Sequence, residues 1–391
     1  MNVADSELVK GILNNEGFLA AATPDSADAL FVNTCAIREH AEEKVHSLLG
    51  NFYRFKKNRP EMVIGVLGCM AQSMKHDLLE SKPYVDIVLG PDSYRRLPGI
   101  LKRHEKDQNS QVDTTLSRFE VYEDLFPNRK KGVNAWISIM RGCDKFCSFC
   151  IVPFTRGRER SRSLEGIIAE VEQAVFDGFV EITLLGQNVN SYNYKDIRFH
   201  QLLEEVAKTQ GLKRIRYTSP HPQDITYDLL ITMAIHDNIC NHVHLPLQAG
   251  SDRILKRMNR TYSRGQFIQL AKMIREVVPN CGISTDIIVG FPGETDGEFK
   301  KTLDVMEEIK FDSAFTFKYS PRRGTKAAEY EDQIIDKVKQ MRLEMIIAAQ
   351  KFHTLERNQH YVGRVESVIA EKESRRSVNQ LAGRTDSNKW V

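Results

Sequence analysis

The chain has 391 residues, a formal net charge of +3 at pH 7, 41% hydrophobic and 27% charged residues. This is the composition of an ordinary soluble protein with room for two or three domains. No apolar run is long enough to span a membrane, and the first residues have neither a basic stretch nor an apolar segment for secretion. We therefore expect a cytoplasmic protein with no membrane partner. Seven cysteines, three of them close together, fit a reducing compartment better than a disulfide framework.

The first part of the chain alternates helices and buried strands. Apolar spacing predicts a first helix over residues 5–16, and short apolar runs predict strands at 29–35, 62–69 and 85–90, each leading into a helix. Regular alternation of strand and helix implies a doubly wound parallel sheet with helices on both faces, which we assign to residues 1–103. This domain opens on a helix with no strand before it, so we expect its first strand to be missing.

Two cysteines of this domain, Cys35 and Cys69, each lie where a strand ends and a helix begins. Equivalent strand ends of an open parallel sheet face one crevice, the usual ligand site of such folds. The two thiols therefore form a candidate ligand pair. The alternative is that each is a small buried hydrophobic residue, which is the commoner role of a single cysteine.

The second half of the chain repeats the alternation after a polar, charged stretch at 104–131 that we interpret as a linker. Residues 132–357 contain six strand-helix units, too few for a closed eight-unit barrel. We expect a partial, open (β/α)6 barrel with its site at the carboxyl ends of the strands. The strands are predicted at 135–140, 181–185, 214–217, 242–245, 283–289 and 314–317, and the intervening helices at 164–176, 199–208, 227–235, 266–277 and 298–309.

A long amphipathic helix over residues 332–357 follows the barrel. Its apolar residues predict a packing face formed by Ile335, Val338, Met341, Met345, Ala349 and Phe352. Residues 358–391 then alternate as a β-hairpin strand does, with too few residues left for a free-standing fold. We expect the start of a third module that is cut short.

Three cysteines, Cys143, Cys147 and Cys150, lie within one short loop after the first barrel strand. Soft thiolates at short spacing are what zinc and iron-sulfur clusters require. A structural zinc needs four protein ligands, and no Cys or His follows within a few residues to complete the set. The motif therefore favours a cluster with an open iron. Three unrelated buried cysteines would fit poorly, because Asp144 and Ser148 make the loop polar.

Polar and glycine residues follow the other barrel strands, where ligand contacts are expected. Gln187, Gln248 and Asp286 are candidates to hydrogen-bond a cofactor, and Gly290 is a candidate to let backbone approach an adenine ring. Each of them serves equally well as a turn or cap residue. The two interpretations stay open for each position.

Four arginines, Arg156, Arg158, Arg160 and Arg162, follow the cysteine loop. Their planar guanidinium groups bind phosphate oxygens in pairs, which favours a nucleic-acid partner. The alternative is a solvated charged loop neutralised by its own acidic neighbours. Cys240 and Cys281 have no cysteine nearby, so we interpret them as core or surface thiols.

Taken together, these motifs resemble the radical S-adenosylmethionine (SAM) superfamily, whose open iron is chelated by SAM. The CxxxCxxC spacing with Phe149 before the last cysteine carries this resemblance, and Phe149 is accordingly a candidate cofactor contact. The stretch from Arg141 to Arg162, with 217–222, most resembles the MiaB-type tRNA methylthiotransferase family. The resemblance spans essentially the whole chain and implies that residues 358–391 begin a TRAM module, a small RNA-binding β-barrel.

The resemblance implies two 4Fe-4S clusters and SAM as cofactors. Cys143, Cys147 and Cys150 would hold the SAM cluster, and Cys35 and Cys69 would hold an auxiliary cluster whose third cysteine is absent from this chain. One SAM would methylate a sulfur at the auxiliary cluster, and another would yield the radical that removes hydrogen from the adenine. The family adds a methylthio group to carbon 2 of N6-isopentenyladenosine next to the anticodon. Its partners would be the tRNA anticodon loop, an electron donor and a sulfur donor.

Two alternatives remain at this point. Within the same class, the enzyme would modify a ribosomal-protein aspartate or a threonylcarbamoyl adenosine. In a different class, the chain would be a noncatalytic RNA-binding protein with a structural metal. The arginine-rich stretch favours tRNA over a protein substrate.

Overall fold

The computed structural model describes the chain from residue 1 to 391 except for residues 35–38, 375–376 and 378; the side chains of 39–43 are also outside the description. The chain divides into two compact units. The N-terminal unit comprises residues 1–130, 140–144 and 150–162, and the barrel unit comprises 131–139, 145–149 and 163–391. Each unit is described by itself.

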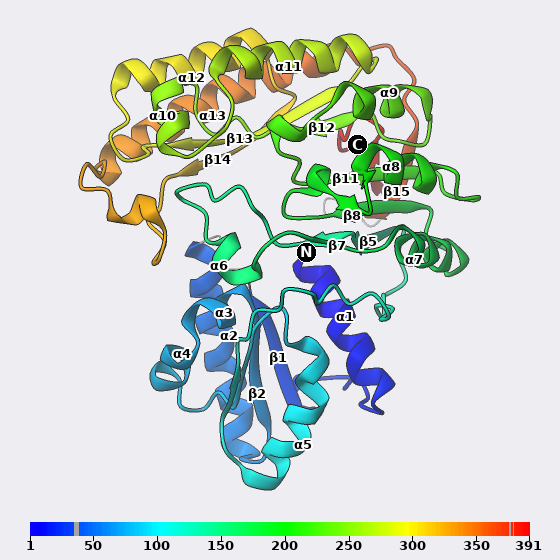
Figure 1. Ribbon diagram of the computed structural model, residues 1–391, viewed down its shortest axis with the longest axis vertical. Helices are drawn as coiled ribbons and strands as arrows, with labels where there is room; N and C mark the ends of the chain where they lie inside the picture. Colours follow the sequence, from blue (N-terminus) through cyan, green and yellow to red (C-terminus); the bar gives the residue numbers. More distant parts are fainter. Residues whose placement is uncertain (35–38, 375–376, 378) are drawn as a thin grey trace. The chain divides into compact units, whose positions relative to one another are not determined.

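A four-stranded parallel sheet forms the centre of the N-terminal unit, with strands in the order β1-β2-β3-β4. Helices cover both of its faces (Figure 1), so the predicted doubly wound sheet is present. Leu8 and Ile12 of the first helix pack with Ile87 on one face, and Leu49 packs with Val66 on the other. The elements are α1 (Asn2–Asn15), β1 (Ala29–Thr34), α2 (Glu39–Asn58), β2 (Val63–Gly68), α3 (Cys69–Met74), α4 (His76–Ser81), β3 (Ile87–Leu89), α5 (Leu97–Asp107) and β4 (Gln111–Asp113).

The stretch predicted as a linker, residues 104–131, belongs largely to this unit. Residues 104–107 complete α5, and β4 adds a fourth strand beside β3. Tyr122 is buried, and its hydroxyl accepts a hydrogen bond from the Tyr94 N–H at 3.0 Å. The linker prediction is wrong here because a short polar edge strand carries no apolar run, so its pattern is that of a loop.

Six parallel strands form the barrel unit. The strands follow one another in chain order, in two three-stranded sheets (β5-β8-β11 and β12-β13-β14) joined by a parallel bridge from Ile215 to Ile239. This is the partial (β/α)6 barrel that the sequence predicts. The strands are β5 (Asn134–Ser138), β8 (Glu181–Leu185), β11 (Arg214–Tyr217), β12 (His242–His244), β13 (Gly282–Val289) and β14 (Ser313–Lys318).

Four of the barrel helices, α7, α9, α11 and α12, begin at side-chain caps. The Ser163 hydroxyl accepts the Gly166 N–H, and Thr295 forms a reciprocal capping box with Glu298. These caps explain why the predicted helix limits agree closely with the observed ones. The helices are α7 (Leu164–Phe176), α8 (Phe199–Ala207), α9 (Tyr227–Ile235), α10 (Asp252–Arg257), α11 (Arg264–Val277), α12 (Asp296–Ile309) and α13 (Asp336–Gln359).

The predicted packing face of α13 is wrong. Met341 is 50% and Phe352 63% exposed, whereas the buried face contains Lys339, Arg342 and Gln350. Arg342 is buried because it pairs with Glu294 at 2.9 Å, and the Gln350 amide donates to the Phe311 carbonyl at 2.8 Å. Polar partners on the barrel, which lie far away in sequence, select the face that packs.

The end of the chain forms an antiparallel pair, β15 (Val368–Glu373) with β16 (Leu381–Thr385). Arg384 pairs with Glu181 of β8 at 2.9 Å, and Arg216 donates to the Thr385 carbonyl at 2.8 Å. The hairpin is therefore fixed to the barrel strands by the buried Arg216 and the partly buried Arg384. A TRAM barrel in this region stays a prediction.

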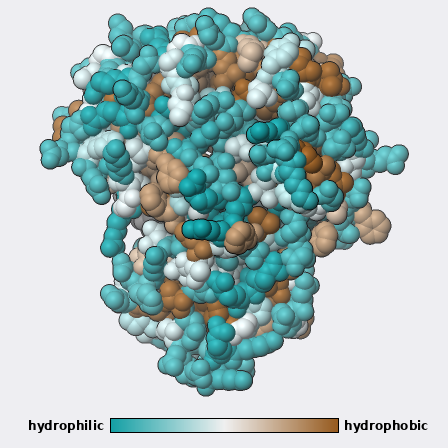
Figure 2. Space-filling view, in the orientation of Figure 1, coloured by the Kyte–Doolittle hydropathy of each residue, from teal (hydrophilic) through white to brown (hydrophobic). Residues whose placement is uncertain are grey.

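Hydrophilic side chains predominate on the face drawn in Figure 2, with apolar ones in small dispersed groups. Among the residues that the structure describes, no helix is both long and apolar enough to cross a membrane.

Candidate functional site

The loop with the three clustered cysteines starts from a short antiparallel pair in the N-terminal unit, β6 (Met140–Arg141) with β7 (Arg160–Ser161). Gly142 follows with a φ of +82°, and a Cβ there would collide with the Arg158 carbonyl. Only glycine fits this close approach of two backbones. The Cys143 N–H then donates to the Gly157 carbonyl at 3.2 Å, which fixes the direction in which the loop leaves the pair.

Residues 145–149 of the loop belong to the barrel unit, where the turn after α10 holds them. The Ser148 hydroxyl donates to the Arg257 carbonyl at 2.8 Å, and the Asn259 amide donates to the Phe146 carbonyl at 2.9 Å. Phe146 has a φ of +47°, which a non-glycine residue rarely adopts. Arg260 Nη1 donates to the sulfur of Cys147 at 3.3 Å. The thiol of Cys147 thus has a fixed donor.

The chemistry of the donors in this loop fits an iron-sulfur cluster. Cys143, Cys147 and Cys150 are partly exposed, and none of them is in a disulfide. Across the part of the chain that the structure describes, no three His, Cys, Asp or Glu side chains converge into a ready metal site. The assignment therefore depends on the three soft ligands, their spacing and the donor on Cys147.

Cys69, the first residue of α3, lies in a buried ionic network of the N-terminal unit. Arg156 Nε donates to its sulfur at 3.2 Å, and the same guanidinium pairs with Asp5 at 2.6 Å. Arg141 pairs with the other oxygen of Asp5 at 2.8 Å. Burial alone would raise the pKa of Asp5, but the two arginines lower it below its usual value, so the carboxylate stays charged.

The network brings Cys69 close to the cysteine loop. Cys69 and Ile151, the residue after Cys150, pack together within the N-terminal unit. Cys69 is therefore a neighbour of the residue that follows Cys150. Cys35, the other predicted ligand of this domain, lies outside the described residues.

The four arginines predicted to contact RNA do not form one exposed surface, which corrects that expectation. Arg156, Arg160 and Arg162 are each less than a tenth exposed. Arg160 pairs with Asp92 at 3.0 Å, just as Arg156 pairs with Asp5. A buried guanidinium needs such a carboxylate because an unpaired buried charge is costly. Arg158 alone is exposed, with a side chain 71% accessible.

Gln248 and Asp286 meet in the barrel unit. Gln248 has a φ of +65°, and its N–H donates to the Asp286 carbonyl at 2.8 Å. Its side-chain Oε1 is buried and has no hydrogen-bond partner among the described residues. Buried polar atoms nearly always have a partner, so this atom is suited to a ligand.

The Asp286 carboxylate lies 3.3 Å from His244 Nε2, and Ser284 Oγ is 2.9 Å from the other ring nitrogen of His244. His242 Nε2 contacts the same hydroxyl at 3.0 Å. Burial lowers the pKa of His242 to about 3, so its ring is neutral. The result is a continuous polar chain along the inner strands β12 and β13.

The remaining predicted contacts have structural roles of their own. The Gly290 N–H donates to Glu294 at 2.7 Å, and a Cβ on Gly290 would collide with Lys339 of α13. Phe149 packs edge-on against Phe291, with ring centroids 6.4 Å apart. Gln187 is half-buried just after β8. A SAM contact at these three positions stays a prediction.

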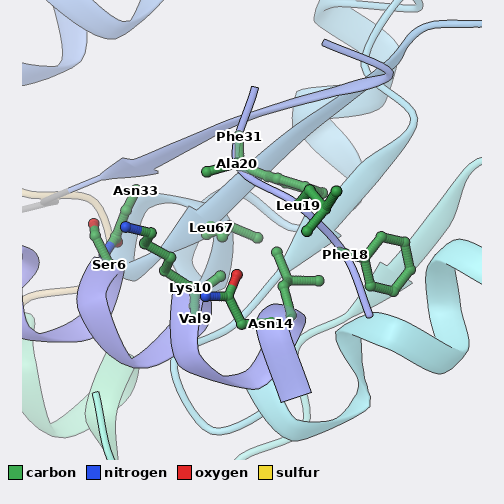
Figure 3. A pocket seen from close by; sticks show the side chains of 11 residues that line it. Ser6, Val9, Lys10, Asn14, Phe18, Leu19, Ala20, Phe31, Asn33 and Leu67 are labelled. Carbon is green, nitrogen blue, oxygen red and sulfur yellow. The ribbon is translucent and has the colours of Figure 1, made fainter. Parts of the chain in front are cut away.

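A cavity of about 210 Å³ lies in the N-terminal unit beside α1 and β1 (Figure 3). Lys10 extends along it, and Ser6 lies beside Asn33, whose amide donates to the Ser6 hydroxyl at 3.2 Å. None of the predicted site residues lines this cavity. It is therefore distinct from the candidate site.

Sequence patterns missed Arg260, which contacts Cys147, and Asp5, which pairs with the arginine on Cys69. Asp5 occupies an ordinary position in an amphipathic helix, and Arg260 follows a short helix that was not predicted. Asp5 lies on the apolar face of α1, which indicates that its carboxylate has a buried cationic partner. The sequence does not show which residue this partner is.

Two family models match the chain. Residues 137–306 match the radical SAM superfamily, and residues 1–90 match the uncharacterized protein family UPF0004. Two named relatives are similar to this chain over its whole length. The tRNA-2-methylthio-N(6)-dimethylallyladenosine synthase of Carboxydothermus hydrogenoformans is 44% identical over 397 residues, covering 100% of this chain and 90% of the relative. The synthase of the same name from Porphyromonas gingivalis is 45% identical, covering 100% and 86%.

Solved structures share the fold at low identity. The radical SAM methyltransferase TsrM from Kitasatospora setae, with cobalamin and a 4Fe-4S cluster bound, has a TM-score of 0.63 at 14% identity and covers 83% of this chain and 73% of that chain. The cobalamin-dependent radical SAM enzyme OxsB has a TM-score of 0.60 at 12% identity, covering 89% and 53%. These likenesses support the fold alone.

Proposed function

We propose, from the premise that this chain belongs to the tRNA-2-methylthio-N(6)-dimethylallyladenosine synthase family within the radical SAM superfamily, that it adds a methylthio group to carbon 2 of N6-isopentenyladenosine beside the anticodon of tRNA. The observation that carries this proposal is identity of 44–45% to named synthases along the whole chain. Membership of the superfamily brings a 4Fe-4S cluster and SAM as cofactors.

Cys143, Cys147 and Cys150 hold the SAM cluster through their thiolates. The open iron and SAM, when bound, supply the one-electron chemistry that generates a radical able to remove hydrogen from the adenine carbon. Gly142 and the β6-β7 pair fix where the loop begins, and Arg257 and Asn259 anchor its middle. The loop backbone is thus held before any cofactor binds.

Gln248 and Asp286 orient SAM within the barrel. The unpartnered Oε1 of Gln248 would accept a hydrogen bond from a donor group of SAM. The His244 ring holds the Asp286 carboxylate at 3.3 Å, which limits the directions in which that carboxylate accepts. Phe149, Gln187 and Gly290 complete this proposed set of contacts.

Cys69, together with Cys35, contributes ligands to an auxiliary cluster that carries the sulfur. The packing of Cys69 against Ile151 supports this role, because it brings Cys69 next to the residue that follows Cys150. The Asp5, Arg141 and Arg156 network fixes the surroundings of the Cys69 thiol.

Arg158 is the one arginine of the four that remains a candidate for tRNA. Its guanidinium now pairs with Asp144 at 2.5 Å, so a phosphate would exchange with that carboxylate. Both groups are solvent-accessible, and an exposed pair of this kind has little stability of its own. The exchange is therefore feasible at little cost.

The test uses the full chain, reconstituted anaerobically with iron and sulfide and supplied with SAM, a reductant and isopentenylated tRNA. Mass analysis of the digested nucleosides should show the methylthio product, and a Cys147→Ala protein should not form it. Modification of an aspartate-containing peptide instead of tRNA would contradict the substrate. About one zinc per chain and no acid-labile sulfide would contradict the radical mechanism.

A further inference from the structure

Guanidinium groups lie against two of the cysteines proposed as cluster ligands, one in each unit. In the N-terminal unit, Arg156 Nε donates to the sulfur of Cys69 at 3.2 Å. In the barrel unit, Arg260 Nη1 donates to the sulfur of Cys147 at 3.3 Å. The two arginines come from different elements, one at the end of α6 (Val152–Arg156) and one after α10. The two contacts are therefore independent of each other in sequence.

Both contacts are held in place by further partners. Arg156 pairs with the buried Asp5 at 2.6 Å. The Arg260 guanidinium lies over the Tyr262 ring, 5.1 Å from its centroid, and its Nε donates to the Tyr262 hydroxyl at 3.0 Å. Neither guanidinium is therefore free to turn away from its sulfur at little cost.

Hydrogen bonds to the sulfur ligands and nearby charge are among the factors that set the potential of an iron-sulfur cluster. Reduction adds one electron, so an N–H donor and a positive charge stabilise the reduced state more than the oxidised state. We propose that Arg260 is a positioning residue that holds the sulfur of Cys147 and raises the reduction potential of the cluster bound there. This inference rests on the cysteine assignment of the proposed function.

The two guanidinium charges differ in how far neighbouring carboxylates compensate them. The charge of Arg156 is partly cancelled by Asp5, which Arg141 shares. Arg260 forms no ion pair with any carboxylate among the described residues; its partners are the Tyr262 hydroxyl, the Pro246 carbonyl and Cys147. The positive charge of Arg260 is therefore available to the cluster at Cys147, and the inference concerns Arg260 alone.

The experiment is a potentiometric titration of the full chain, reconstituted anaerobically and followed by electron paramagnetic resonance. One electron passes from dithionite to the cluster, and the guanidinium keeps all of its protons. A Cys69→Ala background restricts the signal to the cluster that Cys147 holds. Iron and sulfide are measured first in every protein.

Arg260→Gln should retain its iron and sulfide while the ratio of reduced to oxidised cluster at a fixed potential falls about tenfold, which corresponds to about 59 mV for a one-electron couple. Arg260→Lys should show a smaller fall because it keeps the charge but changes the donor geometry. Arg364→Gln and Arg54→Gln, at exposed positions in the barrel unit and the N-terminal unit, are the matched controls and should show none.

An unchanged midpoint in both Arg260 variants, with the cluster intact, would overturn the inference and leave the proposed function standing. If Arg260→Gln loses its cluster, the Arg260→Lys titration decides: an unchanged midpoint overturns the inference, and a lowered one supports it. A parent protein that binds no cluster at all would instead overturn the proposed function.

Discussion

The Arg156 guanidinium that contacts Cys69 in the N-terminal unit shares a buried carboxylate, whereas the Arg260 guanidinium that contacts Cys147 in the barrel unit lies among neutral groups. Asp5 is 1% exposed and pairs with Arg141 and Arg156, so these three charged groups form a buried ionic triad in the N-terminal unit. The barrel unit uses an aromatic ring, a hydroxyl and a carbonyl instead. Two similar guanidinium contacts with sulfur therefore differ in their surroundings: a carboxylate neutralises the charge in one, and neutral groups surround the charge in the other.

The difference predicts how substitutions at each site affect folding and cofactor binding. Removing one member of a buried ion pair leaves an uncompensated charge, so the N-terminal site is sensitive in its folding. The barrel site has no buried counter-ion to lose among the described residues, so changes there should act on cofactor binding and potential with less effect on folding. Four predictions test this contrast.

The largest effect is expected from exchanging the cysteines themselves. Cys147→Ala should lower the cleavage of SAM to 5′-deoxyadenosine by about a thousandfold or more, because the reaction depends on that ligand. Cys69→Ala should leave SAM cleavage in place and abolish methylthio transfer. Chromatography of 5′-deoxyadenosine and mass analysis of nucleosides measure the two steps. Cys281→Ala, a buried thiol of the barrel unit, is the control; methylthio product from Cys69→Ala would contradict the division of roles.

Asp5→Asn should destabilise the N-terminal unit by about 3–5 kcal/mol, because both arginines lose their buried counter-ion. Urea denaturation followed by circular dichroism gives the free energy of unfolding. The exposed Asp25→Asn change should stay within about 0.5 kcal/mol of the parent. A loss below about 1 kcal/mol for Asp5→Asn would mean that the triad is not the stabilising feature described here.

Gln248→Ala should weaken SAM binding about tenfold, the value of roughly one hydrogen bond, while the free energy of unfolding stays nearly unchanged. Equilibrium dialysis with labelled SAM measures the dissociation constant. Gln340→Ala, the same change at an exposed position of α13, is the control. Equal affinities in the two variants would remove Gln248 from the proposed contacts.

The smallest effect is expected at a partly exposed ion pair of the barrel unit. The hydrogen bond from Arg253 lowers the pKa of Glu298 to about 2, from an ordinary 4.5. The resulting stability of about 1 kcal/mol, screened because Arg253 is half exposed, is complete above pH 4.5 and is lost as the pH falls toward 2. Glu298→Gln should remove this part of the pH dependence of the melting temperature, and a parallel pH profile in parent and variant would contradict the pairing.

Local patterns predicted the framework of the molecule well. The α7 limits follow from a Ser163 cap and an apolar stripe that includes Ile167 and Val171, all within one short stretch of sequence. Strand β8 is an uninterrupted buried run, and such runs are readily recognised. Where the determinants of an element lie within that element, sequence was sufficient.

Contacts between residues far apart in sequence explain three errors or omissions of the predictions. Arg156 and Arg160 have the composition of a phosphate-binding loop, but Asp5 and Asp92 are 151 and 68 residues away and bury them. The α13 face was reversed because its buried polar residues have partners on the barrel. Arg260 was missed because a single arginine after a short helix has no pattern that connects it with Cys147.

The position of Asp5 also has a consequence for synthesis on the ribosome. The carboxylate on the first helix finds its two guanidinium partners only 136 and 151 residues later. Contacts of such long sequence separation close large loops and form slowly. During translation, therefore, α1 cannot complete its ionic contacts until Arg156 has left the exit tunnel, and by then β1 to β4 have already emerged. The N-terminal unit should thus mature later than its place in the chain suggests, and it is the part of the nascent protein that chaperones would have longest access to.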